Sequence, residues 1–256
     1  MYKPTHPYPS SYGKNAFVGL GYVPAEDEGV VISTLLDDLV SYWALGEAGG
    51  TRYDSVGDND LTDNNTVVGV AGKNGNAASL VGASNQSLGL GQLAISGIPA
   101  AIWTSSGWIN LRLHANSKIF WGSITRGTVD NWTLDTGSTP GDIHLVIWDG
   151  EGTPINELTV ATGAIEAWHH VVFGYDGANH FLSVDGAAPV TQAPSQAPPH
   201  VPASFGIGSM LDFSGFSATD YVTAYIDEVA FWNRALTSDE CVELYNAGAG
   251  KFYPFE

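Results

Sequence analysis

Alternation of apolar and polar residues in short segments limits what this chain can fold into more than any other feature. Residues 109–114 and 143–148 place apolar side chains at every second position. Successive side chains of a β-strand point to opposite faces, so this alternation predicts strands with one buried face. Residues 181–184 end in the turn Asp185-Gly186, and similar glycine-containing turns between the segments favour antiparallel strands.

The composition agrees with an all-β fold. Only 14% of the residues are charged, while the chain holds 31 glycines and 13 prolines, which suits short strands and tight turns. Its 44% hydrophobic content is that of a packed core, and 256 residues fit one all-β domain of roughly 200–250 residues. Residues 221–232 are apolar on both faces, as in a central strand, and the proline-rich residues 192–202 predict a loop within that domain.

Two segments favour turns of helix. Residues 35–43 follow helical spacing briefly, which predicts one helical turn and then a strand from about residue 39 to 45. Near the C-terminus, Thr237 and Glu240 have the spacing of a capping box, Cys241 and Leu244 share an apolar face, and Gly248 supplies a stop. We therefore expect one short C-terminal helix.

The first 33 residues differ from the rest. Three prolines and three tyrosines stand within the first twelve positions, and proline restrains both itself and the residue before it. This composition predicts an extended N-terminal arm over residues 1–33 and a folded domain over residues 34–256. The arm is either a mobile tail or an anchor that docks on a neighbouring molecule.

The charge balance excludes some partners. There are 27 acidic against 9 basic residues, a formal net charge of −18, so nucleic acid and anionic membranes are disfavoured. Cys241 is the only cysteine, which excludes an intrachain disulfide, and no apolar stretch approaches the ~18 residues of a membrane span. The N-terminus lacks the features of a signal peptide, so we expect a chain that is cytosolic, trimmed, or carried out of the cell in a larger particle.

Three groups of segments, taken together, resemble the laminin-G-like, concanavalin A-like jelly-roll family. They are residues 39–47 with 49–55 and 72–77, residues 167–172 with 183–186, and residues 226–240 with 244–248. The resemblance covers roughly residues 36–255 and implies two antiparallel sheets packed face to face. It also implies carbohydrate, calcium or protein ligands on the concave face or the loop rim. Domains that open with a Leu-Val-x-Tyr-Trp-x-Leu strand, as at residues 39–45, are frequent in phage virion proteins and in secreted bacterial proteins.

No catalytic motif is present in the sequence. The Glu-x-Asp-x-x-Glu strand of retaining glucanases on this fold is absent, as are a Gly-x-Ser-x-Gly elbow, a His-Glu-x-x-His pair and a phosphate loop. Asp227 and Glu228 are adjacent, so a regular strand would point them to opposite faces and prevent them from acting as a pair. His169 and His170 would likewise face opposite ways, and we interpret them as structural. We therefore expect a protein that is not an enzyme.

The resemblance implies a structural calcium ion held by Glu47, Asp54 and Asp227. In similar calcium-binding sandwiches, an early loop and the last long strand often meet at an ion. Asp227 interrupts an apolar strand, and a buried carboxylate needs a partner. The alternative is a hydrogen bond from the backbone or from Arg234. The nearby Asp58, Asp60 and Asp63 lack the sixth-position glycine of a helix-loop-helix calcium loop and are interpreted as a polar turn.

Sugar binding requires exposed aromatic rings. Trp43, Trp168 and Trp232 match family positions that pack in the core. The other candidates are Trp121, Trp132 and Trp148, in the middle of the chain. Trp121 and Trp148 are each followed by polar or turn residues, so these two are predicted to bind carbohydrate.

These observations predict an all-β, two-sheet antiparallel jelly-roll sandwich that serves as a non-catalytic, surface-displayed binding module. The favoured setting is the surface of a phage virion, as a head decoration or fibre component with carbohydrate adhesion. The arm would contact capsid or fibre proteins, and the chain would form a homo-oligomer in the assembly. A secreted, extracellular bacterial carbohydrate-binding or adhesion module is the alternative, and a divergent glycoside hydrolase is the less favoured third.

Overall fold

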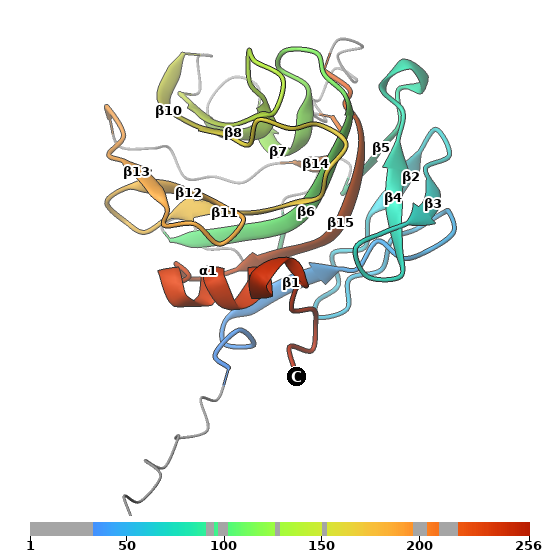
Figure 1. Cartoon of the computed structure of the whole chain (residues 1–256), viewed down its shortest axis with the longest axis horizontal. Coiled ribbons are helices and arrows are strands. Elements are labelled where there is room, and N and C mark those ends of the chain that lie inside the picture. The colour runs from blue at the N-terminus through green and yellow to red at the C-terminus, as the bar shows by residue number, and fades with distance from the viewer. Residues whose placement is uncertain are drawn as a thin grey trace, which may run out of the picture. The chain divides into compact units, whose positions relative to one another are not determined.

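The computed structural model describes residues 33–90, 95–96, 102–125, 129–149, 153–196, 204–209 and 220–256. These segments form two antiparallel sheets with a short helix, α1, against one of them (Figure 1). The predicted jelly-roll sandwich with one C-terminal helix is therefore confirmed. All but the last residue of the predicted arm, residues 1–33, lies outside the described residues.

The first sheet has eight strands, in the order β13, β12, β11, β6, β15, β4 and β3, with β1 paired to β15. Their bounds are Leu39–Trp43 (β1), Val68–Ala71 (β3), Asn76–Leu80 (β4), Trp103–Leu113 (β6), His169–Tyr175 (β11), His180–Val184 (β12), Val190–Gln192 (β13) and Thr223–Trp232 (β15). The long strand predicted from residue 221 is thus β15, and it lies inside the sheet between β6 and β4.

The second sheet has seven strands, in the order β10, β9, β8, β7, β14, β5 and β2. Their bounds are Thr62–Asn64 (β2), Ser87–Gly89 (β5), Ile119–Thr125 (β7), Val129–Thr136 (β8), Asp142–Trp148 (β9), Pro154–Ala161 (β10) and Phe205–Ile207 (β14). Short 3₁₀ turns occur at Gly82–Ser84 and Asn246–Gly248.

The main core lies between the sheets. Apolar side chains from alternate positions of both sheets meet there, and the largest include Trp43, Trp121, Phe173, Phe205 and Phe231. Such rings dominate core energetics because each buries a large apolar area, and Trp43 stacks on Phe205 with centroids 5.2 Å apart. The alternation predicted for residues 143–148 is confirmed, since Ile143, Leu145 and Ile147 all belong to this core. In residues 109–114 it holds for Ile109 and Leu111, whereas Leu113 at the end of β6 is exposed.

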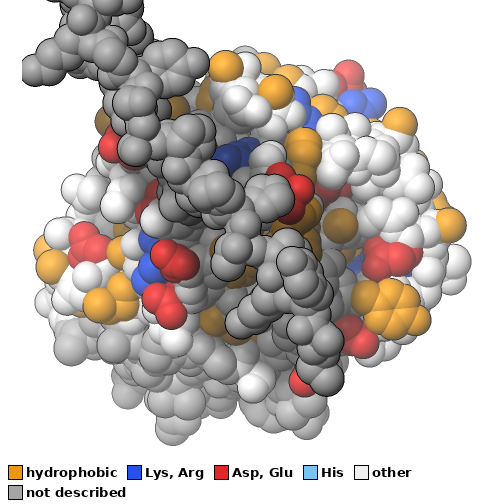
Figure 2. All heavy atoms as spheres, turned by 90° about the horizontal axis from the view of Figure 1, so that it is seen from below, with side chains coloured by type: hydrophobic (Ala, Val, Ile, Leu, Met, Phe, Trp, Pro, Cys, Tyr) orange, Lys and Arg blue, Asp and Glu red, His pale blue; other side chains and the backbone are white. Residues whose placement is uncertain are grey.

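A smaller core lies on the opposite face of the eight-stranded sheet, beneath α1 and the C-terminus (Figure 1). It includes Leu35, Trp232, Cys241, Leu244 and Phe255. Figure 2 shows the molecule from this side, with acidic and basic side chains scattered among apolar ones. No helix in the described part of the chain is long and apolar enough to cross a membrane.

Helix α1 spans Ser238–Tyr245 and begins as predicted. Thr237 Oγ1 accepts a hydrogen bond from the Glu240 backbone N–H at 3.2 Å, and Glu240 Oε2 accepts one from the Thr237 N–H at 2.8 Å. The helix ends before the predicted stop, because Asn246 already adopts the left-handed conformation at φ 47°. Gly248, at φ 86°, closes the short 3₁₀ turn that follows.

A bulge in β15 shows that the expectation of opposite faces for Asp227 and Glu228 was wrong. Ile226 and Val229 both belong to the main core, although they are three positions apart, because the register with β6 shifts between Asp227 and Ala230. Glu228 takes up the extra residue in a left-handed conformation at φ 55°. Asp227 and Glu228 therefore both face the loop at residues 72–75, rather than opposite sides of the sheet.

Candidate functional site

A groove runs along the outer face of the seven-stranded sheet, on the side away from the main core. The groove consists of two adjoining hollows of about 340 and 330 Å³, and Ser117, His144 and Glu157 line both of them. Asp135 and Trp148 also line the first hollow, and Thr159 also lines the second. We call the two hollows together the sheet groove.

Strand register brings the groove residues together. Across β8, β9 and β10, one row of neighbours is Asp135, His144 and Thr159. The adjacent outward-facing row is Thr133, Val146 and Glu157. Because neighbouring strands lie ~4.8 Å apart, these rows place carboxylates from β8 and β10 on either side of β9.

The floor and the rim of the sheet groove differ in exposure. Ile119, Thr133, Asp135 and Val146 are buried, at 2–4% exposed, although they face away from the main core. Trp148 is half-buried and Glu157 is exposed. The groove therefore offers a sheltered floor, part of an indole face and an accessible carboxylate.

Asp135 and His144 form the one charged pair described in the groove. His144 Nδ1 lies 3.2 Å from Asp135 Oδ1, and Thr133 Oγ1 donates to Asp135 Oδ2 at 3.0 Å. Burial raises the pKa of Asp135 more than its hydrogen bonds with His144 and Thr133 lower it. The hydrogen bond with Asp135 raises the pKa of His144 above its ordinary value.

The two tryptophans that were predicted to bind sugar lie in different places in the structure. Trp148 lines the sheet groove. Trp121 is fully buried in the main core, where its Nε1–H donates to Ser105 Oγ at 3.0 Å, and it presents no surface to a ligand. A register shift between Ile119 and Trp121 places Trp121 opposite Leu134 in the core, which corrects the expectation of an exposed ring. Trp43 and Trp232 are buried as expected, whereas Trp168 is only half-buried.

The acidic groove residues were not identified from the sequence. His144 and Trp148 belong to the alternating segment 143–148, where they occupy positions opposite to the apolar residues 143, 145 and 147. Asp135 and Glu157 join them only through the pairing of β8 and β10 with β9. The relevant sequence feature was a polar residue at outward positions of three successive strands.

The predicted calcium ligands do not converge. Asp54 accepts hydrogen bonds from the backbone N–H groups of Tyr42, Val56 and Asn59, so it organises its own loop. Glu47 accepts from the Tyr53 N–H at 2.9 Å and approaches Arg52. Among the residues that the structure describes, no group of three or more His, Cys, Asp or Glu side chains could hold a metal ion.

Asp227 instead belongs to a buried acid pair with Glu228. Asp227 Oδ2 accepts from the backbone N–H groups of Lys73 and Asn74, at 2.7 and 3.2 Å, in agreement with the backbone alternative from the sequence. Glu228 accepts from the Asn74 side-chain amide at 2.9 Å and from the Tyr42 hydroxyl. Asp227 Oδ1 is buried with no hydrogen-bond partner among the described residues.

Burial and mutual repulsion perturb this acid pair. Burial, followed by the charge of Glu228, raises the pKa of Asp227 to about 8. Burial also raises the pKa of Glu228 to about 7, against the hydrogen bonds from Tyr42 and Asn74. The two carboxyl groups therefore do not both carry a full charge at neutral pH.

Neighbouring segments close over the acid pair. A Cβ atom at Gly72 would lie 2.5 Å from Asp227 Oδ2, so only glycine fits there. Lys73 Nζ lies 4.2 Å from the centre of the Trp108 ring and donates to the Gly248 carbonyl. The Tyr253 N–H donates to the Tyr42 hydroxyl at 3.1 Å. These contacts connect the 72–75 loop, β1, β15 and the C-terminal segment, so we interpret the acid pair as part of the fold rather than as a ligand site.

Comparison with known proteins places this fold in a family. The sequence profile of the concanavalin A-like lectin/glucanases superfamily matches residues 82–241. No curated protein sequence matches the chain.

Solved structures share the fold at low sequence identity. The binding domain of Paraclostridial mosquitocidal protein 1 is 15% identical, with a TM-score of 0.60 over 83% of this chain and 52% of that one. Domain 4 of an extracellular arabinanase from Geobacillus stearothermophilus, in complex with arabinotriose, is 17% identical, with a TM-score of 0.55 over 80% of this chain and 97% of that domain. A Trypanosoma rangeli sialidase in complex with 2,3-difluorosialic acid is 15% identical, with a TM-score of 0.58 over 83% of this chain and 34% of that enzyme.

The chain thus spans about half of the mosquitocidal binding domain and about a third of the sialidase, but nearly all of the arabinanase domain. At these identities, the likeness shows a common fold.

Proposed function

This chain belongs to the concanavalin A-like lectin/glucanases superfamily, and we propose that it is a non-catalytic module that binds carbohydrate in the sheet groove. The observation that carries the proposal is that the half-buried Trp148 and the exposed Glu157 line one hollow together with Asp135 and His144. Sugars present apolar C–H faces that pack on aromatic rings and hydroxyl groups that donate to carboxylates. A concave site with an apolar surface and a few fixed polar groups suits such a ligand. The arabinanase domain, solved with arabinotriose, has the same fold and nearly the same extent, which adds support.

Calorimetric titration with a panel of oligosaccharides that includes arabinotriose tests the proposal. We expect Trp148→Ala to weaken the best ligand at least tenfold, because it removes the stacking surface. Trp168→Ala is the matched control, since Trp168 is also half-buried and does not line the groove. Equal losses in both variants, or no binding by any member of the panel, would contradict a sugar site in this groove.

A glycoside hydrolase is the second candidate function. Asp135 and Glu157 line the same groove from strands on either side of β9, so their strands lie roughly 10 Å apart. Inverting hydrolases hold their two carboxyl groups about 6.5–9.5 Å apart. Against this candidate, Asp135 is buried beneath the groove and already bonded to His144 and Thr133. Release of reducing ends from the best-binding oligosaccharide, lost in Glu157→Gln, would establish catalysis and overturn the binding-only proposal.

We further propose that the module is displayed on a phage particle, on the head or a fibre. The support is the resemblance of residues 39–45 to the opening strand of domains from phage virion proteins. The proposed anchor is the arm at residues 1–33, which would contact capsid or fibre proteins and neighbouring copies. Deletion of residues 1–33 should leave the sandwich folded but prevent its incorporation into purified particles. Recovery of the chain from culture medium without particles would favour the secreted bacterial alternative.

A further inference from the structure

We infer that the sheet groove selects its sugar by charge, taking amine-bearing and neutral saccharides and rejecting those that carry a carboxylate. This inference rests on the proposed sugar-binding function and names the chemical class of its ligand. It follows from the charges that line the groove and from how each of them is paired.

Both hollows of the groove contain acidic side chains. Asp135, Glu157 and Asp220 line the hollow that contains Trp148, and Asp142 and Glu157 line the adjoining one. None of the described lining residues is a lysine or an arginine. A sugar carboxylate placed there would meet like charges without the cationic partner that usually binds it.

His144 does not supply that partner. Its Nδ1 lies 3.2 Å from Asp135 Oδ1, so a protonated His144 is already neutralised by the carboxylate beneath it. The pair as a whole adds no positive charge to the groove. Glu157, which is exposed, and Asp142 form no ion pair with any described residue.

Long-range electrostatics act in the same direction. The chain has a formal net charge of −18, so the surrounding field attracts cations and repels anions. Since Glu157 is exposed, salt will screen its interaction with a ligand over a Debye length of about 10 Å at 0.1 M ionic strength. The selectivity should therefore be strongest in dilute buffer and weaker in concentrated salt.

The test uses three tetrasaccharides that share a β-1,4-linked glucose backbone. They are chitosan tetraose with free amines, neutral cellotetraose, and cellotetraose oxidised to carboxylates at C6. Binding is measured by calorimetry in about 20 mM and about 500 mM salt. We expect chitosan tetraose to bind most tightly, cellotetraose less tightly and oxidised cellotetraose most weakly. At low salt the Kd of the oxidised tetraose should be at least ten times that of chitosan tetraose, and at high salt this ratio should be smaller.

Two variants show whether the groove sets this order. Glu157→Gln removes one lining charge and should reduce the ratio of Kd values between oxidised cellotetraose and chitosan tetraose at least threefold. Glu166→Gln is the control, because Glu166 is also exposed but lies outside the groove, and it should leave this ratio unchanged.

The outcomes separate this inference from the proposed function. Equal or tighter binding of the oxidised tetraose overturns the charge selection, while sugar binding itself stands. An unchanged ratio in Glu157→Gln overturns it as well. Failure of all three tetraoses to bind overturns the inference, and the oligosaccharide panel with Trp148→Ala then decides separately whether the groove is a sugar site.

Discussion

The outer faces of the two sheets both carry buried acidic residues, but they use them in opposite ways. Beside the eight-stranded sheet, the 72–75 loop and the C-terminal segment close over Asp227 and Glu228, and Arg234 holds Glu240 in the first turn of α1. On the seven-stranded sheet, the acids lie on or beneath an open groove, and Glu157 remains exposed. The first arrangement serves the fold, whereas the second leaves a carboxylate free to meet a ligand.

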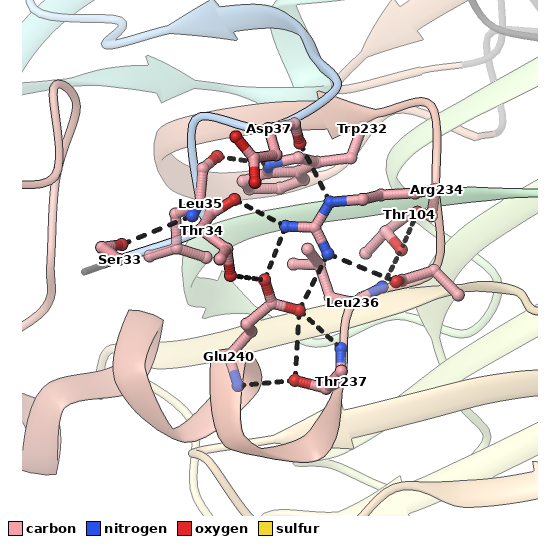
Figure 3. A network of polar contacts seen from close by, with 11 residues as sticks. Ser33, Thr34, Leu35, Asp37, Thr104, Trp232, Arg234, Leu236, Thr237 and Glu240 are labelled. Carbon is pink, nitrogen blue, oxygen red and sulfur yellow. Dashed lines mark hydrogen bonds and ion pairs between the residues drawn. The ribbon is translucent and has the colours of Figure 1, made fainter. Parts of the chain in front are cut away.

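The covered face shows that an unusual acid in a sequence need not mark a ligand site. Figure 3 shows the clearest case, in which Arg234 makes two hydrogen bonds to Glu240, at 2.8 and 2.6 Å. Arg234 also donates to the backbone carbonyls of Thr34 and Asp37, so it ties the start of the domain to α1. The same segment that resembles the family, residues 226–240, therefore works as an internal connector.

The largest effect should come from breaking this connector. Arg234→Ala leaves Glu240 buried without its charged partner and frees the carbonyls of Thr34 and Asp37. We expect a loss of about 2–3 kcal/mol in the free energy of unfolding, because Glu240, whose side chain is 8% exposed, loses its charged partner, although Arg234 itself is 21% exposed. Urea unfolding at pH 7 measures this loss.

Lys251→Ala provides the control, because Lys251 pairs with Glu243 at 2.7 Å with a quarter or so of each side chain exposed. That variant should lose no more than about 1 kcal/mol. Burial alone would raise the pKa of Glu240, but its bonds with Arg234 and Thr34 lower it to about 2. The stability that the ionised Glu240 contributes is therefore present above pH 4.5 and is lost as the pH falls toward 2. The difference in the free energy of unfolding between wild type and Arg234→Ala should therefore be smaller at pH 3 than at pH 7. An equal loss in both variants would show that the burial of Glu240, whose side chain is 8% exposed against 28% for Glu243, does not set the cost of losing the partner.

The second effect concerns Asp227. Its folded pKa of about 8 exceeds the ordinary value, so the folded protein binds more protons than the unfolded chain between about pH 4 and 8. Stability is therefore lost as the pH rises through this window. Asp227→Asn keeps an acceptor for the N–H groups of Lys73 and Asn74 and removes the titration. We expect the variant to be more stable than wild type at pH 8 by about 1–3 kcal/mol, and to show a flatter pH dependence.

The calcium hypothesis predicts the opposite for the same residue. If Asp227 holds an ion, millimolar calcium should raise the Tm of the wild type and EDTA should lower it, because a ligand of the folded state stabilises it. Asp227→Asn would then abolish the calcium response and lower the Tm. Thermal melts of both proteins with calcium and with EDTA distinguish a protonated Asp227 carboxyl group from an Asp227 carboxylate that binds calcium.

Most of the fold could be predicted because its determinants are local. Alternation placed the strands with Ile109 and Leu145 inward, and the spacing of Thr237 and Glu240 located the start of α1. The bulge at Asp227 and Glu228 was missed because regular alternation was assumed through the whole strand. In the structure the inward positions change from even numbers before the acids to odd numbers after them, and a strand that is apolar on both faces conceals this change in the sequence.

The site was harder to predict because its residues meet through strand register. Trp148 and Trp121 have similar neighbours in the sequence, yet a register shift before Trp121 turns that ring into the core. Asp135 and Glu157 come together only once β8 and β10 both pair with β9. A one-residue shift in register moves the side chains that follow it to the other face of the sheet, so these positions depended on where each strand pairing shifts.

A smaller effect is expected at the cap of α1. Thr237→Ala removes the side-chain acceptor for the Glu240 N–H and should cost about 0.5–2 kcal/mol of stability. Thr237→Ser retains the hydroxyl group and should recover most of the loss. Chemical unfolding of the three proteins checks this order, and a serine variant as weak as the alanine one would show that the hydroxyl group is not what stabilises the helix.

The smallest effect on stability is expected on the open face, at Glu157. Its side chain is exposed and forms no ion pair with any described residue, so Glu157→Gln should change the free energy of unfolding by no more than about 0.5 kcal/mol. Removal of one negative charge from an acidic groove relieves repulsion, so the change should if anything stabilise the protein. Thermal unfolding at low and high salt measures it, with Asp176→Asn as a contrast, because Asp176 accepts hydrogen bonds from Ala178 and Asn179 in a tight turn. A groove residue that binds ligand need not support the fold, whereas an acid held by the protein must. If Glu157→Gln destabilised the sandwich as much as Arg234→Ala, the carboxylate would belong to the structural network of its own sheet, and the contrast between the two faces would be lost.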